Sequence, residues 1–365
     1  MRSIGSKHRP LWQVLIADVL IAGAALLVFA YFHHVRPARL ASEDVVIERP
    51  VQTAYSVSPV PEADVTPAPA ATDEPTPVPE PTAHQEPTPV PTPDPVGVFA
   101  LRHEGKFTDG EVITFSEDGV YTYKSKYLNI AVSRQRVPED SSSGTWESTV
   151  YVTDFYVRDI TCLQGVFAGD SFSQGNYEWL ARIAERTGAV AAVNGDFCTM
   201  RKYGIVVRNG KLYRSTHSSF DACAIYWDGT METYYSDDWN GKDIAKRGAY
   251  LAFSFGPKLL DKSGQPLKKF NQTDAVIGRN PRTAIGYFEP GHYCFVTVDG
   301  RTSVSRGLTL GGLSNFMASL GCKAAYNLDG GESASLWFMG DIVSQPYNDG
   351  RKISDALILK DLAED

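Results

Sequence analysis

The chain has 365 residues, of which 43% are hydrophobic, so it is long enough to bury one large core or two smaller ones. Its formal net charge is −8 at pH 7, so the chain has no excess of basic residues, which argues against nucleic acid as a partner. The patterns along the chain, taken below from the N-terminus, therefore have to indicate another class of ligand.

An apolar stretch near the N-terminus has the length that spans a bilayer as a helix. It covers residues 11–32, is interrupted only by Gln13 and Asp18, and follows three basic residues. A cleaved signal peptide is the competing interpretation, but the apolar region is long for one and no clear small-x-small cleavage site follows it. We expect residues 1–10 to be a cytoplasmic tail and residues 11–32 to be an uncleaved anchor in the lipid bilayer of the cell membrane. The C-terminal part would then lie outside the cytoplasm.

A proline-rich tract follows, with Pro-Thr, Pro-Val and Pro-Glu pairs recurring up to about residue 97. Proline cannot donate backbone hydrogen bonds, and the tract has almost no large apolar residues, so it cannot build a core. We expect residues 33–97 to form a disordered linker. About 45 residues in the polyproline conformation would reach roughly 140 Å, enough to hold a domain well away from a membrane.

The folded region begins with short strands and continues with a mixture of strands and helices. Residues 98–150 favour strands at 112–115, 120–123 and 129–132, with a hairpin signal at Asp118-Gly119, and are expected to be a β-rich N-terminal part. Residues 151–365 are expected to form the main domain, of the α+β or α/β class with a mixed β-sheet core. Further strands are predicted at 204–207, 223–227, 231–235, 251–255, 283–288 and 293–298.

Two helices are predicted in this main domain. Asn176 can cap a helix that runs to Thr187 and ends at Gly188. Thr309 can cap a second helix, whose apolar stripe ends at Gly321. The excess of strands over helices favours a sheet-based core.

Four clusters of polar residues and glycine each adjoin an apolar run. Asp-Gly and Gly-Gly are also common tight-turn pairs, but four such clusters in one domain indicate strand ends that converge. The clusters are Asn194-Gly195-Asp196-Phe197, Asn280-Pro281-Arg282-Thr283-Ala284-Ile285-Gly286, Val298-Asp299-Gly300-Arg301 and Asn327-Leu328-Asp329-Gly330-Gly331-Glu332-Ser333.

These motifs, together with Ser305-Arg306-Gly307-Leu308-Thr309-Leu310 and Leu320-Gly321-Cys322, occur in the order seen in the phosphodiester glycosidase family. The resemblance covers roughly residues 150–362. It implies hydrolysis of a sugar-1-phosphate diester at the glycosidic bond, which releases a free sugar and a phosphate monoester. Such chemistry requires a carboxylate at the anomeric carbon and cations or backbone N–H groups that hold the phosphate.

The resemblance also implies roles for particular residues. Arginine suits the phosphate because its planar fork binds two oxygens. We assign phosphate recognition to Arg282 and Arg301, with Arg306 as a third candidate, and catalytic carboxylate roles to Asp196, Asp299 and Asp329. Substrate binding through side chains or backbone is assigned to Asn194, Gly195, Thr283, Asn327, Gly330 and Gly331. Two plain structural alternatives stay open: Arg282 could pair with an aspartate, and Asp299-Gly300 could be an ordinary turn.

Glu332 departs from the family pattern, in which a third glycine is more usual. A carboxylate there could crowd the turn, repel an anionic substrate, or add a metal ligand or a base, so Glu332 is a fourth catalytic candidate. No cofactor is required by the pattern. The Asp and Asn oxygens could nevertheless hold Ca²⁺ or Mg²⁺, through ligands that the spacing does not identify.

The cysteines form an odd set without metal-ligand spacing: Cys162, Cys198, Cys223, Cys294 and Cys322. An extracytoplasmic domain could form one or two disulfides, although Cys294 and Cys322 lie in apolar runs that indicate buried thiols. A nucleophilic role for Cys198 lacks the histidine neighbour that would activate it.

Two functions are therefore considered. The first is a membrane-anchored extracytoplasmic hydrolase that cleaves sugar-1-phosphodiesters in a cell-surface polysaccharide, capsule or wall polymer. The second is a non-catalytic surface protein that uses the same fold to bind an anionic glycan.

Overall fold

The computed structural model describes residues 96–362 apart from 117–118 and 142–143, together with residues 16, 20–24, 26–27, 38–40 and 42–50. The expected cytoplasmic tail, most of the expected anchor and the proline-rich residues 51–95 lie outside the described residues. Within the described part of the chain, no helix is long and apolar enough to cross a membrane.

The largest sheet has seven strands in the order β17-β15-β16-β6-β5-β4-β3. A long hairpin forms its centre, and β6 pairs with β5 on one side and with β16 on the other. The expected division between residues 98–150 and 151–365 therefore falls inside β6, and the two portions share one sheet. The strands are β3 Val112–Phe115, β4 Tyr121–Lys124, β5 Leu128–Ser141, β6 Gly144–Val157, β15 Arg282–Glu289, β16 His292–Val298 and β17 Ala324–Asn327.

Two further sheets pack near it, with the orders β19-β18-β9-β20-β7 and β13-β12-β14-β10-β11-β2, and β1 pairs with β8. Each pairing between described strands is antiparallel, so the sheets are not mixed in direction, and of the two expected classes α+β applies. The strands are β1 Ala38–Arg39, β2 Val45–Val46, β7 Leu163–Phe167, β8 Ser173–Gln174, β9 Ala191–Asn194, β10 Gly204–Arg208, β11 Lys211–Thr216, β12 Ala222–Tyr226, β13 Met231–Tyr234, β14 Ala249–Phe253, β18 Leu336–Phe338, β19 Asp341–Ile342 and β20 Asp355–Leu359.

Few helices accompany these sheets. The predicted N-cap of α5 is confirmed, since the Thr309 hydroxyl accepts from the Gly312 N–H, and Gly188 ends α2 in the left-handed conformation as expected. The start of α2 was predicted wrongly, because the Asn176 amide donates to the Ala168 carbonyl instead of capping a helix. The helices are α2 Leu180–Thr187, α3 Gly241–Lys246, α4 Asp274–Ile277 and α5 Leu310–Ser319, with 3₁₀ turns at Ile160–Cys162, Ala168–Asp170, Cys198–Met200, Gly331–Ser333 and Tyr347–Asp349.

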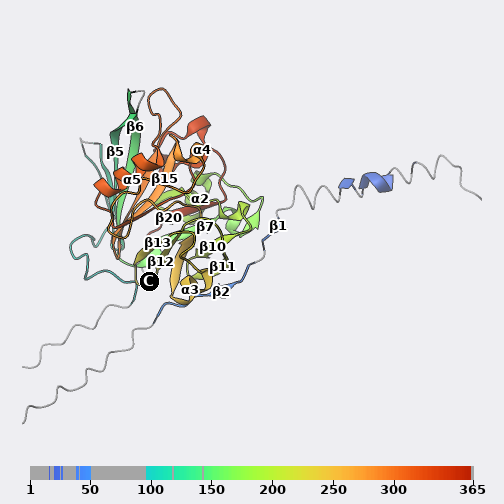
Figure 1. The fold of residues 1–365 in the computed structure, drawn as a ribbon. Coiled ribbons are helices and arrows are strands. Elements are labelled where there is room, and N and C mark those ends of the chain that lie inside the picture. The colour runs from blue at the N-terminus through green and yellow to red at the C-terminus, as the bar shows by residue number, and fades with distance from the viewer. Residues whose placement is uncertain are drawn as a thin grey trace, which may run out of the picture.

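The main core lies where the three large sheets meet. Phe295 of the seven-stranded sheet, Leu357 of the five-stranded sheet and Leu251 of the six-stranded sheet belong to one buried cluster. On the opposite face of the seven-stranded sheet, α5 packs Leu313 and Met317 onto a second cluster (Figure 1). Because each strand shows alternate residues to opposite faces, the sheet is buried on both sides and its strand ends are held rigidly.

A short segment before the proline-rich tract belongs to the folded unit. Residues 42–50, here called the N-terminal strap, run beside β11 and α3 (Figure 1). The Ile47 carbonyl accepts from the Trp227 indole at 2.8 Å, and Arg49 forks onto the Asp159 carboxylate at 2.7 and 3.1 Å. The expected linker at 33–97 therefore includes residues that form strands on the domain, a correction to the sequence-based boundaries.

Both described ends of the proline-rich tract meet at Asp159. Arg49 binds the Asp159 carboxylate, and Val98 forms an isolated β-bridge with the same residue. A Cβ added to Gly97 would stand 3.5 Å from Cζ of Arg49. The described residues on the two sides of positions 51–95 therefore lie at one place on the domain.

The strap should contribute measurably to stability. We expect Arg49→Ala to lower the free energy of unfolding by about 1–2 kcal/mol, because a charge-assisted, partly buried fork to Asp159 is lost. Glu48→Ala, next to it and exposed, should change the same quantity by less than about 0.5 kcal/mol. Urea unfolding of the full chain measures both, and equal effects of the two changes would contradict a stabilising strap.

Candidate functional site

One cleft of about 340 Å³ gathers seven of the predicted site residues. It lies at one edge of the seven-stranded sheet, where β15 begins and its antiparallel neighbours β16 and β17 end. The predicted convergence of strand ends is therefore observed here. The predicted residues that line the cleft are Arg282, Arg301, Asn327, Asp329, Gly330, Gly331 and Glu332.

The glycine pair lets the loop after β17 lie against Pro281. A Cβ added to Gly330 would stand 2.6 Å from the Pro281 carbonyl oxygen, closer than real contacts allow. Gly331 has a φ of +63° and donates its N–H to the same carbonyl at 3.0 Å. Only glycine satisfies both conditions without moving the backbone, so the pair fixes where Asp329 stands.

Asp329 is the best-placed carboxylate in the cleft. Its side chain is 13% exposed, its Oδ1 accepts from the Gly330 N–H at 3.0 Å, and its Oδ2 pairs with Arg351 at 2.9 Å. Burial raises the pKa of Asp329, while Ser333 and Arg351 oppose the rise. A carboxyl group with a perturbed pKa in a cleft is a candidate to take up and release a proton during a reaction.

Three arginines line the same cleft as this carboxylate: Arg282, Arg301 and Arg351. Arg301 donates to Asn280 Oδ1 at 2.8 Å, and Arg351 donates to the Ser333 hydroxyl at 2.6 Å as well as to Asp329. Sequence reasoning missed Arg351, which stands in a loop far along the chain from any motif.

Arg282 is held by the end of α4 instead of by an acid. Its Nε donates to the Leu308 carbonyl at 3.0 Å and its Nη2 to carbonyls at the end of α4, among them Val276 at 2.7 Å. The alternative of an aspartate partner is therefore not observed. Burial lowers the pKa of Arg282 to about 10, so the guanidinium stays charged at neutral pH. Its Nη1 takes part in no hydrogen bond with the described residues, which leaves that nitrogen for a ligand.

Two more cleft residues offer oxygens. Asn327 donates through Nδ2 to the Gly256 and Leu328 carbonyls, while its buried Oδ1 has no partner among the described residues. Glu332 accepts from Asn348 Nδ2 at 2.9 Å through Oε1. An unpaired buried carbonyl is costly, so the Asn327 oxygen is a natural acceptor for a ligand hydroxyl.

Asn194, Gly195 and Thr283 lie beneath the cleft and support it. The Thr283 hydroxyl donates to Asn194 Oδ1 at 2.7 Å, and Asn194 Nδ2 donates to the Asp329 carbonyl at 2.7 Å. The Asp329 N–H in turn donates to the Gly195 carbonyl at 3.1 Å. These residues position the Asp329 loop from below and do not line the cleft.

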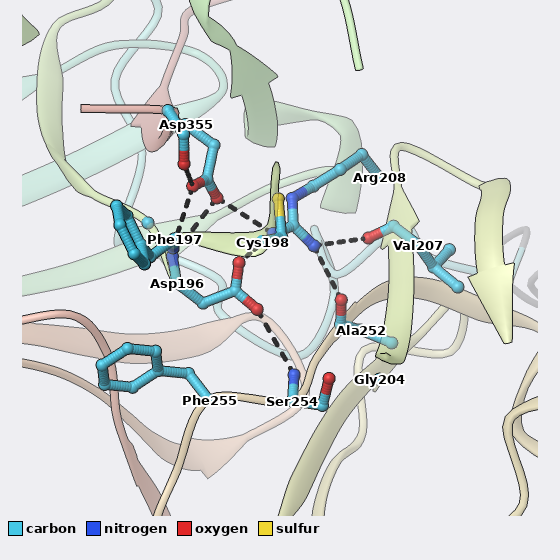
Figure 2. A network of polar contacts seen from close by, with 12 residues as sticks. Asp196, Phe197, Cys198, Gly204, Val207, Arg208, Ala252, Ser254, Phe255 and Asp355 are labelled. Atoms are coloured by element: carbon cyan, nitrogen blue, oxygen red, sulfur yellow. Dashed lines mark hydrogen bonds and ion pairs between the residues drawn. The ribbon is translucent and has the colours of Figure 1, made fainter. Parts of the chain in front are cut away.

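Asp196 is part of a buried ionic network (Figure 2). Arg208 Nη2 donates to Asp196 at 2.7 Å and to Asp355 at 2.9 Å, and all three side chains are at most 2% exposed. Burial raises the pKa of Asp196 and the Arg208 charge opposes the rise. Gly195 must be glycine because a Cβ would stand 2.0 Å from the Asp355 carboxylate. Sequence reasoning missed Arg208 and Asp355, because neither stands in a motif.

The same network fits an arginine better than a metal ion. Oxygens of Asp196 and Asp355 and the sulfur of Cys198 lie within 4.8 Å of one another. However, the Arg208 guanidinium already supplies the positive charge between the two carboxylates. Burial raises the pKa of Cys198 well above its ordinary value, which keeps it a thiol and disfavours both metal binding and nucleophilic attack. The five cysteines are all buried and free.

Two predicted residues point away from the cleft. Arg306 is exposed and lies over the Trp146 ring, with 4.7 Å between its Cζ and the ring centroid. Asp299 is 4% exposed and accepts from the Gln345 N–H at 2.9 Å. Neither residue lines the cleft. Asp299 also differs from the exposed aspartate of an ordinary turn, because its Oδ2 is buried without a hydrogen-bond partner among the described residues.

The buried Asp299 should make stability depend on pH. Burial raises the pKa of Asp299 to about 6, while the Gln345 N–H, Tyr151 and Arg134 oppose the rise. The native state therefore keeps the carboxyl proton of Asp299 up to about pH 6, whereas the unfolded chain releases it near pH 4. The free energy of unfolding therefore falls as the pH rises from about 4 to about 6, and it is not regained at higher pH. We expect Asp299→Asn to stabilise the protein by about 1–2 kcal/mol at pH 7 and not at pH 4. Urea unfolding at both pH values measures this, and a loss of stability at pH 7 would contradict it.

Comparison with known proteins matches a part of this chain to a family model. Residues 187–360 match the family model described as phosphodiester glycosidase. The chain is 27% identical over 292 residues to the SPbeta prophage-derived uncharacterized protein YomE of Bacillus subtilis (strain 168), across 73% of this chain and 45% of that protein. It is 29% identical over 182 residues to the N-acetylglucosamine-1-phosphodiester alpha-N-acetylglucosaminidase of Bos taurus, across 45% of this chain and 34% of that protein. The chain thus spans less than half the length of these curated relatives.

Solved structures share the fold. The zebrafish N-acetylglucosamine-1-phosphodiester alpha-N-acetylglucosaminidase catalytic domain, auto-inhibited by its pro-peptide, aligns with a TM-score of 0.55 and 22% identity over 69% of this chain and 89% of that chain. A hypothetical protein from Synechocystis aligns with a TM-score of 0.50 and 15% identity over 68% of each chain.

Proposed function

Because residues 187–360 form a domain of the phosphodiester glycosidase family, we propose that this protein hydrolyses the glycosidic bond of sugar-1-phosphodiesters. The observation that carries the proposal is the cleft itself. It places a carboxyl group with a raised pKa, Asp329, among three arginines. A carboxylate for the anomeric carbon and cations for the phosphate are the two requirements of this chemistry.

In the proposed reaction, water attacks the anomeric carbon and Asp329 takes its proton. The bond between the anomeric carbon and the phosphate oxygen breaks, and the phosphate monoester leaves with the electron pair. The leaving group is already acidic, so a strong general acid is not needed. Burial raises the pKa of Asp329, which makes this carboxylate a stronger base than an exposed one.

The phosphate would bind to the arginine side of the cleft. Arg301 and Arg351 reach the cleft with guanidinium groups, and the unused Nη1 of Arg282 adds a third donor. Charge-assisted, planar contacts of this kind are the strongest that arginine makes with phosphate oxygens. The unpaired Asn327 Oδ1 would accept from a sugar hydroxyl and so orient the ring.

Glu332 would set the charge balance of the cleft. It stands at the same wall as Asp329 and adds a second negative charge there. A diester substrate carries one negative charge, whereas the phosphate monoester product carries more at neutral pH. Glu332 therefore repels the product more strongly than the substrate, which favours product release. Glu332, which stands where the family pattern has a third glycine, would thus have an electrostatic role.

We also propose that the protein is anchored in a membrane through residues 11–32 and acts on an extracytoplasmic polymer. Leu20, Ile21, Leu26 and Leu27 are each at least 67% exposed, so nothing in the described fold covers them. Five residues separate such an anchor from β1, a reach of at most roughly 18 Å. The domain would therefore work close to the bilayer, on glycosyl-phosphate linkages of a cell-surface polysaccharide, capsule or wall polymer.

The test uses the full chain in detergent with a model sugar-1-phosphodiester. We expect release of reducing sugar and phosphate monoester in equal amounts. Arg301→Ala should raise KM at least about tenfold through the loss of a charge-assisted phosphate contact. Arg306→Ala is the matched control, an arginine from the same loop that lies outside the cleft, and should leave KM unchanged. Saturable binding without turnover would overturn the hydrolase and support the anionic-glycan-binding alternative.

A further inference from the structure

A second pocket of about 390 Å³ lies on the inner face of the seven-stranded sheet, away from the cleft residues. We call it the aromatic pocket. Phe115 and Tyr121 form its outer wall, with their ring centroids 4.4 Å apart, and are 62% and 45% exposed. Arg134 of β5 and Tyr151 of β6 form the opposite wall. Aromatic rings beside an arginine are the surfaces that bind sugars and anions in proteins.

Arg134 is available to a ligand. It is exposed and forms no ion pair with a described residue, and its side chain lies beside the Tyr151 hydroxyl, which also lines the pocket. Arg136 stands two residues further on the same face of β5 but pairs with Glu147 at 3.0 Å. The two arginines on this strand face therefore differ, because Arg136 forms an ion pair and Arg134 forms none with the described residues. Arg134 alone of the two lines the pocket.

Unpartnered buried oxygens lie behind Tyr151. Thr297 pairs directly with Tyr151 in the sheet register, and Asp299 follows two residues later on the same face. Thr297 Oγ1 and Asp299 Oδ2 are buried without a hydrogen-bond partner among the described residues, and Asp299 is 4% exposed. Buried oxygens of this kind are rare in native proteins and require an explanation. Tyr151 stands between these oxygens and the pocket, because it lines the pocket and its hydroxyl contacts Asp299.

One narrow ridge separates this pocket from the cleft. Asp299 contacts Tyr151, which lines the aromatic pocket, and Arg301, two residues later and so at most roughly 7 Å along the backbone, lines the cleft. A second segment makes the same crossing. Val343 lines the aromatic pocket, Gln345 binds Asp299, and the Tyr347 ring lies 5.4 Å from Cζ of Arg301. A polymer seated in the cleft would therefore have a neighbouring unit within reach of the aromatic pocket.

We propose that the aromatic pocket is a second subsite, which binds the adjoining sugar-phosphate unit of a polymeric substrate. The sugar ring packs on Phe115 and Tyr121, its phosphate binds Arg134, and a hydroxyl contacts Tyr151. The subsite rests on the proposed function for its substrate class. It explains why a family-like cleft is joined to an exposed aromatic hairpin, and it predicts that long substrates bind more tightly than short ones.

The test measures binding by calorimetry to the full chain carrying Asp329→Asn, so that no probe is consumed. The probes are phosphodiester-linked trimers of glucose, mannose or N-acetylglucosamine 1-phosphate, each compared with its methyl phosphodiester monomer. We expect at least one trimer to bind about tenfold more tightly than its monomer. Arg134→Ala should remove that gain and leave monomer binding unchanged. Arg136→Ala, the matched control, should change neither Kd.

The outcomes separate the subsite from the hydrolase. If no trimer binds more tightly than its monomer, or if Arg134→Ala and Arg136→Ala have equal effects, the subsite is overturned while monomer hydrolysis by the unmodified chain stands. If the trimer gain depends on Arg134 but the unmodified chain releases no sugar, the subsite holds and the hydrolase falls. Unfolding curves of the Arg134 variant confirm that any loss of binding is local.

Discussion

Replacing Asp329 with asparagine is expected to lower kcat for a sugar-1-phosphodiester by about 1000-fold. The change removes the group that accepts the proton of the attacking water, and general-base catalysis contributes about 100- to 10,000-fold in enzymes. Asparagine keeps an oxygen for the Gly330 N–H, so the loop after β17 should keep its shape. KM should change much less than kcat, because the phosphate contacts of the arginines remain.

The control for this prediction is Asp341→Asn, an exposed aspartate of β19 that lies outside the cleft. It should leave kcat unchanged. Initial rates of sugar release over a range of substrate concentrations give kcat and KM for both variants. Full activity of the Asp329 variant would show that another carboxylate carries the reaction, and Glu332 would then be the next candidate.

Replacing Arg208 with methionine is expected to have the largest effect on stability, a loss of about 3–5 kcal/mol. The change leaves two fully buried carboxylates, Asp196 and Asp355, without the charge that compensates them. Because a buried carboxyl group can escape by taking up a proton, the pKa of Asp196, which burial already raises, should rise further in the variant. The native state then binds more protons than the unfolded state, so the loss should shrink as the pH falls from 7 toward about 4, the pKa of an aspartate in the unfolded chain.

Arg186→Met is the comparison for that prediction. Arg186 also bridges two carboxylates, Asp170 and Glu178, but it lies at the surface with 27% of its side chain exposed. Exposed ion pairs contribute little, so we expect a loss of about 1 kcal/mol or less. Urea unfolding at pH 7 and pH 4.5 measures both variants. Equal losses would show that the buried network does not need its arginine.

The motifs predicted much of the cleft because their chemistry is local. A glycine pair beside Asp329 and an arginine at the start of β15 mark strand ends from sequence alone, and the register then brings them to one edge. What the sequence could not reveal are partners distant along the chain. Asp355 binds the backbone N–H of Asp196 across 159 positions, and Arg351 reaches Asp329 from a separate loop.

The direction of a side chain was also beyond the sequence. Asp299 and Arg301 belong to one motif, yet Arg301 lines the cleft and Asp299 does not. The backbone turns between them, and Arg301 has a φ of +61°. The N-terminal bound of the proline-rich linker was a similar error, because residues 42–50 belong to the folded unit. The composition of the tract predicts that it builds no core, but composition carries no information on whether the segments flanking it dock on one domain. The contacts of Arg49 and Val98 with Asp159 decide that question.

The most direct test of the proposed reaction is to find which bond breaks. The full chain is incubated with a sugar-1-phosphodiester in water enriched in ¹⁸O, and both products are analysed by mass spectrometry at early times. Attack at the anomeric carbon predicts one ¹⁸O in the released sugar and none in the phosphate monoester. Label in the phosphate and none in the sugar would show attack at phosphorus, and the proposed role of the cleft as a glycosidase site would be wrong.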